Sequence, residues 1–202
     1  MGKNLFSAFK NLFIKSFDDE LTDSRKNIVR AEVKAKKQNI TDVYKTEQAN
    51  AVYAKIEQMP EFKEAKTVLM YWSVSDELPT HPFIKKWSIA KTILLPVVKG
   101  QQMTIRPFVS EEMLAQGDFK IMEPMSGNDY LKTVDLVIVP GVAFDRKKKR
   151  IGRGKGYYDK YFKNKRIKKW GIGFDFQLYE SLPSASYDID MDRIITPSET
   201  IW

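Results

Sequence analysis

One stretch, residues 134–162, constrains the fold of this chain more than any other. It begins with a short run of apolar, mostly β-branched residues that ends at Pro140-Gly141, a pattern typical of a strand buried in a parallel sheet. A basic segment with glycines at positions 152, 154 and 156 follows, and aromatic residues at helical spacing come directly after it. The stretch therefore predicts a strand, a glycine-rich loop and a helix, in that order.

The glycine-rich loop has the features of an anion-binding site. Glycines at alternate positions let backbone N–H groups approach a ligand closely, and the helix that follows adds its positive end. Three cations, Arg150, Arg153 and Lys155, lie in or beside the loop. The spacing is neither that of the Walker loop nor that of the dinucleotide-binding pattern, since Tyr157 stands where the latter needs a glycine. We favour a phosphate-binding loop over the alternative, a solvated basic turn.

The same residues resemble the signature of the 5-formyltetrahydrofolate cyclo-ligase family. The resemblance rests on PGVAFD at 140–145 and RIGRGKGYYD at 150–159. Other elements follow in the family's order and extend the resemblance over about residues 24–197. These elements are Lys26 with Arg30, Asp76 to Thr80, Leu95-Pro96, Met103 with Arg106, Glu123-Pro124, Gln177-Leu178, Asp188, and Asp192 to Thr196.

The resemblance implies an enzyme that uses ATP and Mg²⁺ to cyclise 5-formyltetrahydrofolate to 5,10-methenyltetrahydrofolate, with release of ADP and phosphate. In the implied mechanism, the γ-phosphoryl group of ATP moves to the formyl oxygen. N10 then attacks the formyl carbon and phosphate leaves. Phosphoryl transfer needs positioned cations, backbone donors and usually a metal ion, and the glycine-rich loop supplies the first two. It needs no thiol nucleophile, and the chain contains no cysteine.

The resemblance also nominates the residues of each site. The catalytic candidates are Lys155 and Arg153, and Glu77 is the candidate carboxylate for the pterin ring. Asp159 and Asp188 are the implied Mg²⁺ ligands, because this ion takes one or two carboxylates and keeps several waters. The implied ATP-binding residues are Lys26, Arg30, Arg150, Gly152, Arg153, Gly154, Lys155, Gly156, Tyr157 and Tyr158, and the implied folate-binding residues are Trp72, Glu77, Met103, Phe119 and Tyr158.

Each candidate also has a plainer interpretation. Glu77 and its neighbour Asp76 could cap the following helix, and the apolar candidates could pack in the core. Asp190 and Asp192 are alternative metal ligands, and the run 188–192 could instead be a solvated strand entry. Tyr187 departs from the family's pattern, which commonly has histidine there. The single histidine, residue 81, fits a turn better than a catalytic base.

The remaining sequence alternates helical and strand patterns. Helices are predicted from residue 24, over 42–58 with Thr41 as the N-cap, over 80–88, and briefly from 110. Strands are predicted over 68–72, 93–98, 103–108, 170–174 and 193–196, and an irregular connection over 119–124. This alternation predicts an α/β fold, a three-layer αβα arrangement with a mainly parallel central sheet and helices on both faces.

Residues 1–23 lie outside the resemblance and form a predicted amphipathic N-terminal extension, ahead of a single catalytic domain over residues 24–202. The extension is neither a secretory signal nor a myristoylation pattern. We favour a helix docked on its own domain or on a twin subunit, with membrane-surface attachment as the alternative. Its apolar residues at helical spacing are Leu5, Phe6, Phe9, Leu12, Phe13 and Phe17.

The formal net charge of +8 allows nucleic acid, anionic membrane or anionic small molecules as partners. No recognised nucleic-acid motif accompanies the lysine clusters, and no apolar run reaches the length of a membrane span. We therefore expect small-molecule substrates, ATP and 5-formyltetrahydrofolate with or without a polyglutamate tail, and neither nucleic acid nor a membrane span. The expected protein is cytoplasmic and monomeric or weakly homodimeric. Another phosphate-ligand enzyme of sugar-phosphate isomerase type and a basic nucleic-acid-binding protein remain alternatives.

Overall fold

A seven-stranded sheet forms the centre of the fold. The computed structural model describes the backbone of residues 2–117, 119, 121–125 and 127–202, and the side chains in these ranges from residue 18 onwards. The strand order is β12-β11-β9-β6-β1-β2-β3. The bounds are Thr67–Leu69 (β1), Thr92–Lys99 (β2), Gln102–Pro107 (β3), Leu136–Pro140 (β6), Lys168–Ile172 (β9), Arg193–Ile195 (β11) and Thr200–Ile201 (β12). Neighbours from β2 to β11 pair in parallel, and β3 and β12 are antiparallel edges, so the predicted mainly parallel sheet is confirmed.

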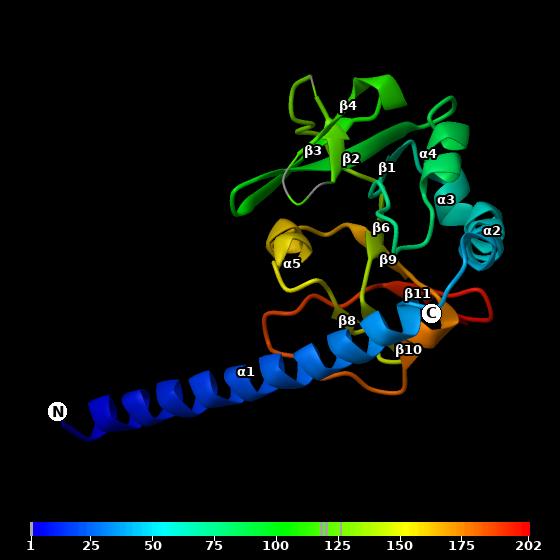
Figure 1. Cartoon of the computed structure of the whole chain (residues 1–202). Coiled ribbons are helices and arrows are strands. Elements are labelled where there is room, and N and C mark those ends of the chain that lie inside the picture. Colours follow the sequence, from blue (N-terminus) through cyan, green and yellow to red (C-terminus); the bar gives the residue numbers. More distant parts are fainter. Residues whose placement is uncertain (1, 118, 120, 126) are drawn as a thin grey trace.

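Successive side chains of the parallel strands pack into two hydrophobic clusters, one on each face of the sheet. Val68 and Leu136 belong to the cluster that includes residues of α2 (Asp42–Gln58), α3 (Pro60–Glu64) and α4 (His81–Trp87). The next residues along the strands, Leu69 and Val137, pack in the other cluster with Phe162 of α5 (Tyr157–Phe162). Figure 1 shows α2 to α4 on one side of the sheet and α5 on the other. Helices cover both faces as predicted, although α5 has only six residues.

A second, smaller sheet was not predicted, and it carries the glycine-rich loop. Its strands, in spatial order, are β10 (Leu178–Tyr179), β7 (Ala143–Asp145) and β8 (Arg150–Ile151). The fully buried carboxylate of Asp145 accepts hydrogen bonds from the backbone N–H groups of Lys147, Lys149 and Leu182 at 2.9, 2.8 and 2.8 Å. These bonds shape the lysine run into the turn of a β7–β8 hairpin, and β8 then leads the chain into the loop.

The connection predicted as irregular over 119–124 is partly a strand. A two-stranded sheet pairs β4 (Leu114–Gln116) with β5 (Met122–Pro124), and single 3-10 turns cover Glu111–Met113 and Asp175–Gln177. The pairing was missed because each strand has only three residues, which is too short for a period-two pattern to show.

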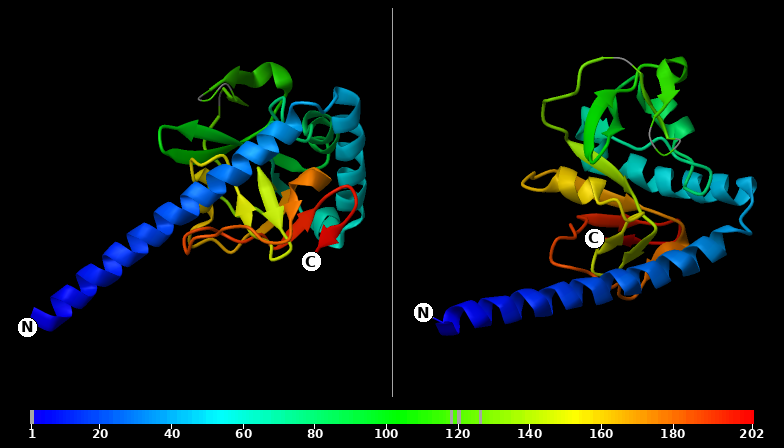
Figure 2. Two further views of the ribbon diagram at one scale, coloured as in Figure 1. Left: turned by 60° about the horizontal axis from the view of Figure 1, so that its bottom comes forward. Right: turned by 60° about the vertical axis from the view of Figure 1, so that its left-hand side comes forward.

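The chain begins with one long helix, α1 (Gly2–Lys37), which runs without interruption across the predicted boundary at residues 23 and 24. Figures 1 and 2 show that its C-terminal half lies across the domain while its N-terminal half continues beyond it. Val33 anchors α1 in a small cluster with Ala143, Ile151 and Leu182. The predicted apolar stripe falls on side chains of residues 1–17, which lie outside the described ones. No helix in the described ranges is long and apolar enough to cross a membrane.

Candidate functional site

Backbone conformation or close packing favours glycine at each of the three loop positions. Gly154 and Gly156 have φ angles of +94° and +67°, which side-chain-bearing residues rarely adopt. At Gly152 the limit is space, because an added Cβ would lie 2.7 Å from Nη1 of the buried Arg150. The loop backbone is thus fixed by its composition, and Gly156 places it directly before α5.

The three predicted loop cations occupy different places. Lys155 is exposed, and its Nζ lies 5.2 Å from the ring centroid of Phe119. Arg150 lies on the buried side of the loop, where its guanidinium donates to the carbonyl oxygen of Pro140 and to Oδ2 of Asp159, both at 3.2 Å. Arg153, half exposed, reaches across to the turn that follows β1. Two of the three cations are therefore presented on the exposed side of the loop.

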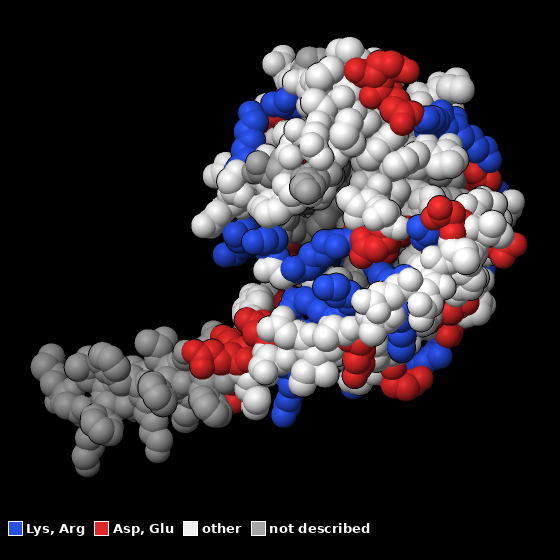
Figure 3. Space-filling view, in the orientation of Figure 1, with Lys and Arg blue, Asp and Glu red and all other residues white. Residues whose placement is uncertain are grey.

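One face of α1 carries three cations, and each contacts a different segment of the site. These contacts are Lys26 Nζ to both carboxylate oxygens of Asp188 at 2.8 and 2.6 Å, Arg30 Nε to the carbonyl oxygen of Gly152 at 2.9 Å, and Lys37 Nζ to Oδ2 of Asp76 at 3.3 Å. Their spacing of four and seven residues corresponds to one and two helical turns. Figure 3 shows Lys and Arg side chains gathered where α1 meets the rest of the domain, with acidic side chains between them.

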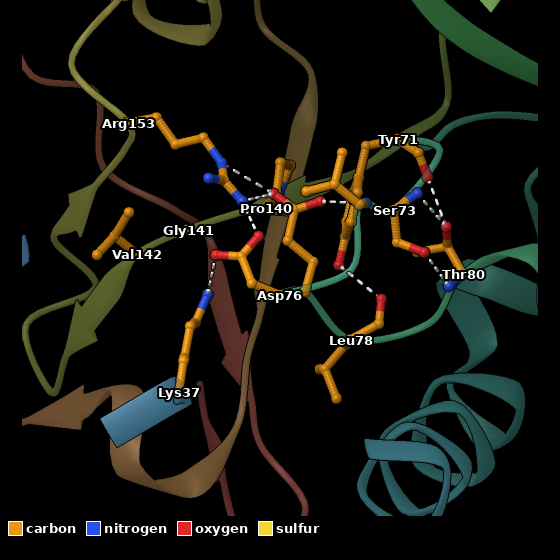
Figure 4. A network of polar contacts seen from close by, with 12 residues as sticks. Lys37, Tyr71, Ser73, Asp76, Leu78, Thr80, Pro140, Gly141, Val142 and Arg153 are labelled. Atoms are coloured by element: carbon orange, nitrogen blue, oxygen red, sulfur yellow. Dashed lines mark hydrogen bonds and ion pairs between the residues drawn. The ribbon is translucent and has the colours of Figure 1, made fainter. Parts of the chain in front are cut away.

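The turn after β1, residues 73–80, is held by its own hydrogen bonds. The Thr80 hydroxyl donates to the carbonyl oxygen of Tyr71 at 2.7 Å and accepts from the backbone N–H of Ser73 at 3.0 Å (Figure 4). The backbone N–H of Val74 donates to Oε2 of Glu77 at 3.1 Å. The helix-capping interpretation of Glu77 is therefore wrong, because its carboxylate binds a donor within the turn rather than at α4.

Arg153 links the glycine-rich loop to this turn. Its Nε and Nη2 donate to Oε1 of Glu77 at 3.2 and 3.0 Å, and Nη2 also donates to Oδ1 of Asp76 at 2.5 Å (Figure 4). Burial raises the pKa of the Glu77 carboxyl, although Arg153 opposes the shift. Partial burial of Asp76 also favours a raised pKa, but the bonds and positive charges of Arg153 and Lys37 outweigh it and lower the pKa of that carboxyl. A predicted phosphate ligand and the predicted pterin ligand are thus in direct contact.

The predicted aromatic ligands divide into buried and accessible groups. Trp72 is buried between the rings of His81 and Phe108, with centroids 4.0 and 5.5 Å away, so it packs in the core. His81 also binds the carbonyl oxygen of Ser73 through Nε2 at 2.9 Å, which agrees with its predicted structural role. The Tyr158 hydroxyl is buried and lacks a hydrogen-bond partner among the described residues, and burial raises its pKa.

The accessible group borders the β2–β3 hairpin. The Tyr157 hydroxyl donates to the carbonyl oxygen of Gly100 at 2.7 Å and so ties α5 to the hairpin turn. Phe119 is exposed, with its ring 6.1 Å from that of Tyr157, and the half-buried Met103 lies on β3. Phe119 therefore lies beside both Tyr157 and Lys155 at the loop, where a ligand ring would find apolar partners.

The two predicted metal ligands lie on segments that contact each other. Oδ1 of Asp159 accepts from the backbone N–H of Ile189 at 3.2 Å, which places the residue after Asp188 against α5. Each carboxylate faces a buried cation, Arg150 for Asp159 and Lys26 for Asp188. Two hard oxygen donors of this kind suit Mg²⁺ that keeps waters and binds phosphate oxygens. Among the described residues no group of three or more acidic or histidine side chains could hold a metal ion by itself.

The alternative metal ligands have other partners. Asp190 pairs with Lys149, with its nearer oxygen at 2.7 Å from Nζ, and Asp192 accepts from the backbone N–H of Lys169 at 2.7 Å. Tyr187, at the position where the family commonly has histidine, donates from its hydroxyl to Asp23 of α1 at 3.3 Å. Asp188 thus faces Lys26, a predicted nucleotide ligand, whereas Asp190 and Asp192 pair with lysines outside the predicted ligand sets.

Two residues of the site were missed by sequence reasoning. Lys37 was not predicted at the site, and Asp76 was predicted only as part of the family-like element at 76–80, with helix capping as the alternative and no role of its own. A signal was present, because Lys37 stands eleven residues after Lys26, close to three full turns of the same helix. The contact of Lys37 with Asp76 could not be read from that spacing, since it depends on how α1 crosses the sheet.

Comparisons with known proteins agree with these features. The model of the 5-formyltetrahydrofolate cyclo-ligase family matches residues 22–197. The chain is 29% identical over 180 residues to the 5-formyltetrahydrofolate cyclo-ligase of Escherichia coli K12, covering 84% of this chain and 98% of that protein. It is 30% identical over 172 residues to the probable cyclo-ligase of Caenorhabditis elegans, covering 76% of this chain and 84% of that one.

Solved structures of 5,10-methenyltetrahydrofolate synthetases also match this chain. The NMR structure of Aquifex aeolicus 5,10-methenyltetrahydrofolate synthetase matches with a TM-score of 0.79 and 33% identity, covering 87% of this chain and 91% of that chain. A 5,10-methenyltetrahydrofolate synthetase from Mycoplasma pneumoniae matches with a TM-score of 0.68, covering 85% of this chain and 98% of that one. At 22% identity, the second match supports the fold alone.

Proposed function

Because the chain belongs to the 5-formyltetrahydrofolate cyclo-ligase family, we propose that it converts 5-formyltetrahydrofolate and ATP to 5,10-methenyltetrahydrofolate, ADP and phosphate in the presence of Mg²⁺. The family and the enzyme class predicted from the sequence are confirmed. An ATP-consuming ligase is accordingly favoured over the isomerase and nucleic-acid-binding alternatives.

The contact between Arg153 and Glu77 is the observation that carries the proposal. Direct phosphoryl transfer from ATP to a formyl oxygen requires that the two substrates lie next to each other. Arg153 belongs to the glycine-rich loop and Glu77 to the turn after β1, and Nη2 of Arg153 lies 3.0 Å from Oε1 of Glu77. A phosphate bound at the loop and a pterin bound at Glu77 would therefore be neighbours.

The proposed reaction has two steps. The bond between the γ-phosphorus and the bridging oxygen of ATP breaks as the formyl oxygen takes the phosphoryl group, which leaves ADP. The amine N10 then attacks the formyl carbon and loses its proton to the departing phosphate or to solvent. The carbon–oxygen bond breaks, and phosphate leaves with the former formyl oxygen. Phosphoryl transfer depends mainly on positioning and charge stabilisation. Lys155 and Arg153 supply the cations, the loop supplies backbone N–H groups, and Glu77 orients the pterin by accepting from its N–H groups.

Mg²⁺ would be held by Asp159 and Asp188 together with nucleotide oxygens, and its role when bound is to neutralise charge on the phosphates. Lys26 and Arg150 now neutralise these two carboxylates. Both cations are also in the predicted ATP-binding set, so nucleotide oxygens would offer them new partners if the carboxylates held the ion.

The test is product formation followed by absorbance in the methenyl band. The purified chain is incubated with 5-formyltetrahydrofolate, ATP and Mg²⁺, and ADP and phosphate are quantified in the same samples. We expect one ADP and one phosphate for each methenyl product, and no product when ATP is replaced by a non-hydrolysable analogue or Mg²⁺ is chelated. Absence of an ATP-dependent rise in absorbance would overturn the proposed function.

A further inference from the structure

Four charged side chains form a chain of alternating sign across the boundary between the two proposed substrate sites. Lys37 binds Asp76, Asp76 binds Arg153, and Arg153 binds Glu77 (Figure 4). The two ends of this chain are largely buried, with 8% of the Lys37 side chain and 13% of the Glu77 side chain exposed. Asp76 and Arg153, in the middle, are 44% and 51% exposed and can therefore exchange partners with a ligand.

The contacts of Arg153 with Glu77 and Asp76 compete with the binding of both proposed ligands. Both hydrogen bonds from Arg153 to Glu77 end on Oε1, and Oε2 already accepts from Val74. Pterin N–H groups would therefore compete with Arg153 for the same carboxylate. A polyphosphate at the loop would compete with Glu77 and Asp76 for the same guanidinium, because one planar fork offers only a few donors.

We propose that Asp76, supported by Lys37, is a positioning residue that holds Arg153 against Glu77 until a substrate binds. The inference rests on the proposed function and adds a role for two residues outside the predicted site. A nucleotide draws Arg153 to its phosphates and frees Oε1 of Glu77 for the pterin. A pterin displaces Arg153 from Glu77 and frees it for the phosphates. Each ligand removes the other's competitor, so their binding is positively coupled.

Lys37 makes the exchange of partners feasible. When Arg153 moves to a phosphate, Asp76 retains Lys37 as its partner and is not left as an uncompensated, partly buried charge. Among the described residues Glu77 pairs with no cation besides Arg153, and burial already raises the pKa of its carboxyl. The carboxylate left without a partner is therefore the one that the pterin needs.

Titration calorimetry on the full chain tests the proposal. The affinity for the Mg²⁺ complex of AMP-PNP, a non-hydrolysable ATP analogue, is measured with and without saturating 5-formyltetrahydrofolate. We expect the folate to tighten nucleotide binding by about fivefold or more in the unaltered chain. In Asp76→Asn, nucleotide affinity without folate should rise while affinity with folate stays near the unaltered value, so the coupling factor shrinks. Asp76→Glu should restore the coupling, and Lys34→Met, an exposed lysine on the same helix, should leave it unchanged.

The outcomes separate the possible explanations. A purely structural role for Asp76 would weaken nucleotide binding equally with and without folate and lower the melting temperature. If the loss of the Asp76 charge acted only through long-range electrostatics, nucleotide affinity would increase equally with and without folate. Either result, or equal coupling in the unaltered chain and in Asp76→Asn, overturns the positioning role while an active enzyme leaves the proposed function intact. An unaltered chain that neither binds nucleotide nor forms product would overturn both.

Discussion

Replacing Glu77 with glutamine separates the two proposed substrate sites by changing one charge and almost no volume. The glutamine can still accept from Val74, but it presents only one acceptor oxygen where the carboxylate presents two. Because the side chain is 13% exposed, its hydrogen bond to a pterin N–H would form largely out of water. A charge-assisted bond of this kind contributes about 1.5–3 kcal/mol, so we expect folate affinity to fall roughly ten- to a hundredfold.

Nucleotide affinity should respond in the opposite sense. Arg153 loses its anionic partner in Glu77→Gln and becomes more available to phosphates, so the dissociation constant for the Mg²⁺ complex of AMP-PNP should stay the same or decrease. Both affinities are measured by titration calorimetry. Glu180→Gln is the matched control, because Glu180 is an exposed carboxylate that also pairs with an arginine, Arg146. Unchanged folate affinity, or equal loss for both ligands, would refute the assignment of Glu77 to the pterin.

Glu77→Gln should also change how folate affinity depends on pH. Burial raises the pKa of Glu77, so the protein should lose the anionic acceptor, and with it folate affinity, at a higher pH than an ordinary glutamate would. This acid limb should be absent in Glu77→Gln. A carboxyl whose pKa is raised on folding favours the folded state most below its ordinary pKa, and this contribution is lost as the pH rises through the raised value. Melting temperatures across that window should therefore fall with rising pH relative to those of the glutamine variant.

Four further substitutions probe the loop, the metal ligands and the hairpin. Lys155→Ala should lower kcat about a hundredfold, with a smaller effect on nucleotide affinity. The control Lys160→Ala, on the exposed side of α5, should have a kcat near that of the unaltered chain. Equal kcat in the two variants would mean that the loop has a structural role. Asp159→Asn and Asp188→Asn should each raise the Mg²⁺ concentration needed for half-maximal rate. In the double variant the effect should be smaller than the sum of the two single effects, because both carboxylates act on one ion. A fully additive effect would mean that the two residues have separate roles. Asp188→Asn should also lower the melting temperature, since it leaves the buried Lys26 without its carboxylate partner. Asp145→Asn should cost about 1–3 kcal/mol in the free energy of unfolding, measured by denaturant titration, because an amide NH₂ would face a backbone N–H; an unchanged midpoint would contradict this.

Most helices, and the strands of the central sheet other than β12, could be predicted because their signals are local. The apolar run before Pro140 is buried on both faces, and such a run needs no tertiary context to be recognised. Thr41 accepts from the backbone N–H of Tyr44 at 3.2 Å, as an N-cap should, so α2 begins where the sequence places it. The glycines of the loop have the positive φ angles or the close contacts that made them informative.

What could not be predicted depends on contacts between distant segments. The β7–β8 hairpin is shaped by Asp145, whose partners include Leu182, a residue 37 positions away. Nothing around Asp145 distinguishes a fully buried acceptor of three backbone bonds from an exposed turn residue. The pairing of Lys37 with Asp76 likewise spans 39 positions and follows from the path of α1 across the domain. Charge patterning identifies such residues as ionic but leaves their partners undetermined.

The ion pairs of the site share one feature that bears on how it would take up its ligands. Lys26 pairs with Asp188, Arg150 with Asp159, and Arg153 with Glu77. Each pair joins a residue proposed for the nucleotide to one proposed for the metal ion or the folate. Burying a charge without a partner is strongly unfavourable, so a ligand-free site of this composition has to neutralise itself internally. Nucleotide phosphates can replace the three carboxylates as partners of the three cations. In the proposed complex, the released carboxylates would be available to the ion and to the pterin N–H groups. Among the described residues, Lys155 and Arg30 pair with no carboxylate, so the site keeps an excess of positive charge for nucleotide phosphates.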